Sequence, residues 1–157
     1  MAGVSRGELR TSVDAESAFY TAFEGADIDA MMAVWASGET DDLMCIHPHG
    51  PRLIGYTQIR ESWEQILTHS PPMRLEISER HVVAVDSLAI HYVNEHIHVG
   101  DDDGPRFTVM ATNVYRRTEH GWRMILHHAS PTPESLEQVS IDSSKTKKRQ
   151  AEDIILH

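Results

Sequence analysis

A chain of 157 residues with 24% charged and 40% hydrophobic side chains can build one domain with a substantial core, and its composition is that of a soluble globular protein. The 14 basic and 24 acidic residues give a net charge of −10, which repels phosphate backbones and argues against nucleic acid as a partner. No apolar run reaches the length of a bilayer span, and the single cysteine, Cys45, excludes an intramolecular disulfide.

The N-terminal third predicts an arm followed by two helices. Residues 1–13 lack the continuous apolar segment of a secretory signal, so we expect a cytoplasmic protein. Apolar residues then recur at steps of three and four from Ala15 to Phe23, and a second helical period runs from Asp27 to Trp35.

A polar corner follows these helices. Two short apolar segments, 43–46 and 52–54, flank the sequence His47-Pro48-His49-Gly50-Pro51, in which proline and glycine predict a turn between strands. This corner is a candidate for the mouth of a pocket. A third helix is predicted over 57–69, and the prolines directly after Ser70 end it.

The rest of the domain is predicted to be sheet. The segments 74–85, 88–99, 106–117 and 122–130 are rich in β-branched residues, alternate in polarity and are separated by short turns. Long neighbouring strands with short turns predict an antiparallel meander, and helices first with sheet second predict an α+β fold. Residues 132–157 are mainly polar and are predicted to be an appended tail, whose Ile154-Ile155-Leu156 end either docks on a partner subunit or frays.

Three short sequences carry a family resemblance. They are Glu-Gly-Ala-Asp-Ile-Asp at 24–29, Ile-His-Pro at 46–48, and the pair Ala-Thr-Asn-Val-Tyr-Arg at 111–116 with Gly-Trp-Arg at 121–123. With this order of elements, residues 14–131 resemble the SnoaL-like and ketosteroid-isomerase-like branch of the nuclear-transport-factor-two-like superfamily. The resemblance implies a cone-shaped, strongly curved antiparallel sheet wrapped around the N-terminal helices, a cystatin-like α+β barrel. It also implies an apolar pocket and a homodimer formed through the sheet.

The resemblance also assigns site residues. His47 occupies the position of the general base in the isomerases, and Phe19 and Asn113 occupy the positions of their two oxyanion hydrogen-bond donors, while Tyr20 lies one residue out of phase with the pocket face. An imidazole titrates near neutral pH, so His47 at a pocket rim can take or relay a proton. The alternative is that His47 only stabilises the turn.

The last strand supplies one histidine to each face of the sheet, because side chains alternate along a strand. We expect His128 to point inward, since Trp122, Met124 and Leu126 share its face at two-residue steps and would line a cavity. His127 would then point outward, and His128 could instead be a structural residue. The complete predicted site has His47, Asn113 and His128 as polar groups and Phe19, Trp63, Ala111, Tyr115 and Ser130 as pocket walls.

The eleven histidines raise a different hypothesis, a metal site. His47 with His49, or His96 with His98, each place two imidazoles close together, and His128 or Glu95 could complete a zinc or iron site. This spacing is common in solvent-exposed strand ends, so we predict neither a metal nor another cofactor. Cys45 lies among apolar strand residues and is expected to be a buried, unreactive thiol.

Two classes of function remain open from the sequence. The leading hypothesis is a homodimeric protein that binds a small apolar or carbonyl-containing molecule, with possible acid–base chemistry in which His47 moves a proton while Asn113 and His128 stabilise a developing negative charge. The competing hypothesis is a non-catalytic ligand sensor or dimerisation module that resembles the association domain of calmodulin-dependent kinases. A pocket lined by the three polar residues favours the first, and an interior filled by side chains such as Trp63 and Met110 favours the second.

Overall fold

The computed structural model describes residues 8–37 and 42–135. Three helices come first, α1 (Ser12–Glu24), α2 (Ile28–Val34) and α3 (Tyr56–His69), with two short strands, β1 (Met44–Ile46) and β2 (Leu53–Ile54), before α3. Four long strands follow, β3 (Met73–Val85), β4 (Leu88–Val99), β5 (Phe107–Thr118) and β6 (Gly121–Pro131). The predicted helices, strands and α+β class are confirmed.

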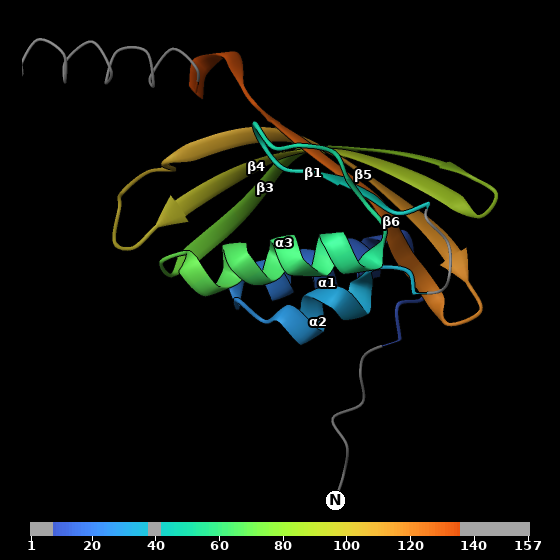
Figure 1. Cartoon of the computed structure of the whole chain (residues 1–157). Coiled ribbons are helices and arrows are strands. Elements are labelled where there is room, and N and C mark those ends of the chain that lie inside the picture. The colour runs from blue at the N-terminus through green and yellow to red at the C-terminus, as the bar shows by residue number, and fades with distance from the viewer. Residues whose placement is uncertain (1–7, 38–41, 136–157) are drawn as a thin grey trace, which may run out of the picture.

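The strands form one six-stranded sheet in the order β2-β1-β6-β5-β4-β3. The predicted antiparallel meander comprises β3 to β6, whereas β1 joins β6 in parallel. The sheet arches over the three helices, which all lie against one of its faces (Figure 1). The sheet curves strongly but stays open, so the arrangement is cystatin-like without a closed barrel.

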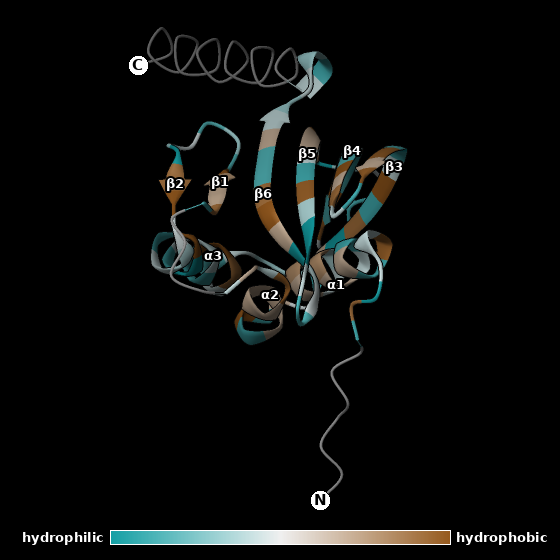
Figure 2. Cartoon of the chain, turned by 90° about the vertical axis from the view of Figure 1, so that its right-hand side faces the viewer, coloured by the Kyte–Doolittle hydropathy of each residue, from teal (hydrophilic) through white to brown (hydrophobic). Residues whose placement is uncertain are grey.

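The two faces of the sheet differ in their surroundings. The inner face packs against α1 and α3, and the alternating polarity of the strands is visible along their length (Figure 2). The alternation is strict over Ala89, His91, Val93 and Glu95 of β4, which are all buried, while Tyr92 between them is exposed. A strand with one covered face buries every second residue, so the local pattern fixes which side chains enter the core.

Two irregularities interrupt this regular pattern. In β3 the register shifts between Ser78 and His81, with Glu79 at a positive φ of 54°. In the β5–β6 pair Val114 lies opposite Leu126 but Tyr115 lies opposite Met124, so Ile125 is an extra residue in β6. Such a β-bulge changes which face the following side chains point to.

The ends of the described chain are tied to the sheet. The backbone N–H of Trp122 donates to the carbonyl of Leu9, and the Ser135 hydroxyl donates to the carbonyl of Thr108. The predicted docking of 154–156 lies outside the described residues. Among the described residues, the helices lack the length and apolar character needed to cross a membrane.

Candidate functional site

The inner face of the sheet carries a connected chain of buried polar groups. Tyr20 of α1 donates a hydrogen bond to Glu95 of β4 over 2.5 Å, and Asn113 of β5 donates to the Tyr20 hydroxyl over 2.9 Å. The Nδ1 atom of His127 on β6 lies 2.6 Å from Asn113 Oδ1. All four residues are buried, so four elements bring their polar side chains to one place away from water.

Four rings lie at the His127 end of this chain. The His127 ring is 5.1 Å from Phe19 and 5.8 Å from Trp63, and Phe19 and Trp63 pack edge to face at 5.5 Å. His47, on the loop after β1, lies 4.8 Å from the Trp63 ring and 6.2 Å from His127. We call Phe19, His47, Trp63 and His127 the ring cluster; His47 is its partly exposed member, so it marks the side from which the cluster is reached.

Burial controls the ionisation of these groups. Burial raises the pKa of Glu95 to about 7, although the hydrogen bond from Tyr20 lowers it in part. Burial also raises the pKa of Tyr20 well above its ordinary value. It lowers the pKa of His47 to about 4 and that of His127 to about 3, the latter also through repulsion by neighbouring imidazoles. At neutral pH both imidazoles are therefore uncharged, whereas Glu95 exchanges its proton near neutrality.

The inward orientation predicted for His128 is wrong. His127 is buried and belongs to the polar chain, whereas His128 is exposed on the opposite face. The prediction assumed that every second side chain after the inward-pointing Met124 also points inward. The extra residue Ile125 shifts this alternation by one, so His127 points inward instead of His128. Ser130 follows His128 to the outer face, so both side chains point away from the buried polar chain that contains Asn113.

The other predicted positions gather on the inner face. Asn113 is in the polar chain, His47 and Trp63 are in the ring cluster with Phe19, and Ala111 and Tyr115 are buried beside Asn113 on β5. Phe19 and Trp63 fill the space between α1, α3 and the sheet, each with no exposed surface. His47, Asn113 and His128 therefore do not share a hollow, because His128 lies on the other face and aromatic side chains fill the inner one.

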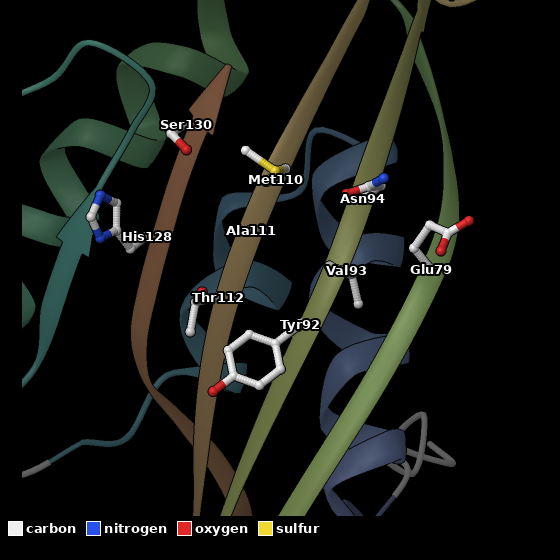
Figure 3. Close-up of a pocket in the computed structure, with 9 residues that line it drawn as sticks. All are labelled: Glu79, Tyr92, Val93, Asn94, Met110, Ala111, Thr112, His128 and Ser130. Atoms are coloured by element: carbon white, nitrogen blue, oxygen red, sulfur yellow. The ribbon is translucent and has the colours of Figure 1, made fainter. Parts of the chain in front are cut away.

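A cavity of about 370 Å³ lies instead on the outer face of the sheet. Figure 3 shows its lining across β3 to β6, with the helices behind the sheet. His128 and Ser130 of β6 border it together with side chains of the neighbouring strands, among them Glu79, Tyr92, Asn94, Met110 and Thr112.

Three residues of the polar chain were missed from the sequence. Tyr20 was placed out of phase, yet both residues are buried, since Tyr20 bonds to Glu95 and Asn113 of the sheet while Phe19 packs on Trp63 of α3. Glu95 had a usable signal, since it continues the buried alternation of Ala89, His91 and Val93 as an isolated acid on an apolar face. His127 could not be found without knowledge of the bulge at Ile125.

A second buried polar cluster lies at another part of the α1–sheet contact. Glu16 of α1 is buried and pairs with Arg80 Nε at 2.9 Å, and His91 Nδ1 lies 3.5 Å from the same carboxylate oxygen. The other ring nitrogen of His91 contacts the Ser12 hydroxyl at 2.9 Å. Because Arg80 reaches Glu16 from the bulged part of β3, this cluster connects the surface with the interior.

The histidine pairs considered for a metal have other partners. His49 is exposed, His96 contacts Ser78 and Thr108, and His98, on the same face of β4 as His96, lies 3.4 Å from Glu76. Within residues 8–37 and 42–135, no three or more His, Cys, Asp or Glu side chains are grouped as they would be around a metal ion.

The thiol of Cys45 contacts the candidate site without the features of a nucleophile. Its sulfur lies 3.6 Å from His47 Nε2, but burial raises the pKa of the thiol to about 12 and lowers that of the imidazole. The pair is therefore neutral, as expected for a buried structural cysteine.

The fold and the buried polar chain define a curved-sheet domain of the nuclear transport factor 2-like class. The model of the SnoaL-like domain matches residues 14–134, and the chain belongs to this family. The chain is similar to a Thiobacillus denitrificans protein provisionally named a calcium/calmodulin-dependent protein kinase type II association domain, with 41% identity, 79% of this chain and 97% of that chain covered, and a TM-score of 0.74.

Two further proteins are similar to this chain. A Streptomyces avermitilis protein, provisionally named a dehydratase of the nuclear transport factor 2-like family, is 30% identical over 75% of this chain and 91% of its own, with a TM-score of 0.69. The F-box protein SKIP8 of Arabidopsis thaliana is 23% identical over 77% of this chain. The chain spans about half the length of that curated relative, 49%.

Proposed function

We propose that the protein binds a small, largely apolar molecule at the ring cluster and that the polar chain behind it holds or moves a proton. The observation that carries this proposal is the continuous contact from Glu95 through Tyr20 and Asn113 to His127. Burying four polar side chains costs free energy that apolar side chains would not cost, so their presence favours a chemical role over packing.

The ionisation of the groups makes Glu95 the member of the chain that exchanges a proton near neutral pH. His47 and His127 are neutral because their pKa values are lowered to about 4 and about 3, so each has a lone pair that can accept a hydrogen bond from a ligand. Glu95, with its pKa raised to about 7, can take up or release a proton at the far end of the chain. In this proposal His127 takes the role first expected of His128, and His47 keeps its own.

Binding requires the aromatic side chains to move. Phe19 and Trp63 occupy the centre of the cluster, and the partly exposed His47 lies against Trp63. A ligand that enters beside His47 would displace part of these edge-to-face contacts, which a largely apolar ligand can replace with its own. The polar group of the ligand, a carbonyl or a hydroxyl, would then reach His127.

The experiment is a comparison of His47 with His49, its exposed neighbour in the same loop. Native mass spectrometry of protein taken directly from cells identifies a retained small molecule, and titration then measures its affinity for wild type, His47→Ala and His49→Ala. We expect His47→Ala to lower the affinity for this molecule at least tenfold and His49→Ala to leave the affinity unchanged. Absence of a retained molecule, or equal affinity in all three proteins, contradicts the proposal.

A second proposal concerns the outer face of the sheet, which we propose pairs with a second copy of this chain. Large apolar side chains are exposed on β3, β4 and β5, and an exposed apolar surface of this kind commonly marks an interface. The association-domain name of the Thiobacillus denitrificans relative supports this occupant. The exposed apolar residues that the strand register places on the outer face are Val83, Val85, Leu88, Tyr92 and Met110.

Sedimentation velocity tests this homodimer. Met110, 45% exposed on β5, is replaced by lysine, and Gln65→Lys on the exposed side of α3 adds the same charge away from the sheet. We expect Met110→Lys to weaken self-association at least tenfold and Gln65→Lys to leave it unchanged. A monomeric wild type, or equal effects of the two lysines, contradicts the proposed interface. The cytoplasmic location expected from the sequence stays a prediction.

A further inference from the structure

The ring cluster contains two nitrogen atoms that make no hydrogen bond with the residues that the structure describes, the buried Nε1 of Trp63 and the Nε2 of His127. Both belong to rings in contact with each other, Trp63 and His127, whose centres are 5.8 Å apart. A buried polar atom without a partner, such as Trp63 Nε1, is unfavourable and calls for a water or a ligand. The chemistry of the two atoms therefore specifies which ligand group could bond to both.

The hydrogen bonds of Asn113 fix the state of His127. The amide nitrogen of Asn113 donates to the Tyr20 hydroxyl, so its oxygen is the atom that faces His127 Nδ1. A carbonyl oxygen only accepts, and Nδ1 must therefore carry the ring proton. Because the lowered pKa keeps the ring neutral, Nε2 has a lone pair, and it makes no hydrogen bond with the residues that the structure describes.

Trp63 supplies the opposite capacity. Its indole Nε1 is a donor that cannot accept, it is buried, and it makes no hydrogen bond with any described residue. Trp63 is in edge-to-face contact with both Phe19 and His47, so its ring stands within the cluster rather than at its margin.

We propose that the ligand of this site carries a hydroxyl group, which accepts a hydrogen bond from Trp63 Nε1 and donates one to His127 Nε2. This assignment rests on the proposed function and names its substrate class, a neutral alcohol, enol or phenol with an apolar body. A hydroxyl both donates and accepts, whereas a ketone can only accept and leaves His127 without a partner. An ammonium can only donate and leaves Trp63 without one.

The surroundings of the two nitrogens also favour a neutral group. The other members of the cluster are Phe19 and His47, the latter uncharged at neutral pH because its pKa is lowered to about 4. An ion would be buried against these rings without a charged partner and would lose its hydration without compensation. A hydroxyl with both hydrogen bonds satisfied does not have this cost.

Matched six-membered rings test the assignment in wild-type protein. Cyclohexanol, cyclohexanone and methylcyclohexane have similar apolar bodies, and only the alcohol can make both hydrogen bonds. We expect cyclohexanol to bind at least tenfold more tightly than either analogue, because a site built to bond a hydroxyl disfavours a molecule that leaves its buried groups unpaired.

Nuclear magnetic resonance provides the site-specific readout. Cyclohexanol should shift the indole N–H signal of Trp63, whereas the indole of Trp35, which is also buried and without a partner among the described residues, should not move. A long-range nitrogen–proton spectrum should show His127 protonated at Nδ1. The conservative variant Trp63→Phe keeps a ring in the cluster and should lower the affinity for cyclohexanol at least fivefold.

The outcomes separate this inference from the proposed function. Equal binding of the alcohol and the ketone at the Trp63 signal, or a His127 ring protonated at Nε2, overturns the hydroxyl assignment and leaves a ligand site. Failure of all three probes to move Trp63, together with no molecule retained from cells, overturns both.

Discussion

The two faces of the sheet carry the same residue types in different surroundings. His127 and His128 are neighbours in β6, and Glu95 and Glu79 lie on neighbouring strands, yet one of each pair is buried in the polar chain and the other is exposed beside the outer cavity. On the inner face the polar groups of the chain bond to one another, and on the outer face their counterparts are exposed. The identity of a residue therefore says less about its role than the face on which it lies.

The face is decided by single-residue features of the backbone. One extra residue, Ile125, reverses the side-chain parity of β6 after Met124 and brings His127 to Asn113. In β3 the shift between Ser78 and His81 brings Arg80 to Glu16, while Glu79 borders the outer cavity. Both polar assemblies of the inner face therefore depend on a bulge.

The largest expected effect comes from the adjacent histidines. His127→Ala removes a ring that packs on Phe19 and Trp63 and leaves Asn113 Oδ1 without its donor, so we expect a loss of about 2–4 kcal/mol in the free energy of unfolding. His128→Ala changes an exposed side chain and should cost less than about 0.5 kcal/mol. Urea unfolding followed by circular dichroism measures both. Equal losses would mean that the two faces are not energetically distinct.

Much of the fold could be predicted because its signals are local. Helix periodicity, the prolines after α3 and the turns between long alternating strands each specify an element without reference to the rest of the chain. The parallel pairing of β1 with β6 was not predicted, because three residues of strand carry no information about a partner eighty positions away. The order of the strands in the sequence predicted only the antiparallel pairing of consecutive strands from β3 to β6.

The site was harder to predict because it is made of contacts between distant segments. Asn113 and His47 could be found from the resemblance and their positions, and Glu95 stood in a clear alternation. His127 depended on a bulge, which has no sequence signature in Met124-Ile125-Leu126. Tyr20 depended on α1 being covered from two sides, which only the packing of α3 and the sheet determines.

The second prediction uses the two glutamates to separate the faces by pH. The pKa of Glu95 is raised to about 7 in the folded protein, from an ordinary value of 4.5, so the folded state retains a proton that the unfolded chain releases. The stability contributed by Glu95 is therefore present below about pH 4.5 and is lost as the pH rises toward 7. The loss has a slope of at most about 1.4 kcal/mol per pH unit.

Glu95→Gln cannot titrate, so the difference in unfolding free energy between wild type and this variant should change across that window and be flat above it. His47 and His127 oppose Glu95, because their lowered pKa values make the folded protein lose stability as the pH falls below about 6.5, and they cancel in the difference. Glu79→Gln on the exposed bulge is the matched control, because it removes the same carboxyl group from the outer face. A flat difference for Glu95→Gln would show that its carboxyl is ionised throughout the window.

The smallest effect is expected for a pair of tyrosines. Tyr20→Phe removes the hydroxyl that joins Glu95 to Asn113 while leaving the ring packed on Phe19, so we expect a loss of about 1–2 kcal/mol. Tyr92→Phe removes an exposed hydroxyl that makes no hydrogen bond with the described residues and should change the stability by less than about 0.5 kcal/mol.

The two phenylalanine variants each delete one hydroxyl, from opposite faces of the sheet. The difference between their losses of unfolding free energy therefore measures the contribution of the polar chain to stability. Thermal and urea unfolding at pH 6, where Glu95 is mostly protonated, and at pH 8, where it is mostly ionised, should give a larger loss for Tyr20→Phe at the higher pH. A hydrogen bond to a carboxylate is stronger than one to a carboxylic acid. An equal loss at both pH values would indicate that Tyr20 contributes to packing alone, and the inner face would then resemble the outer one in its chemistry.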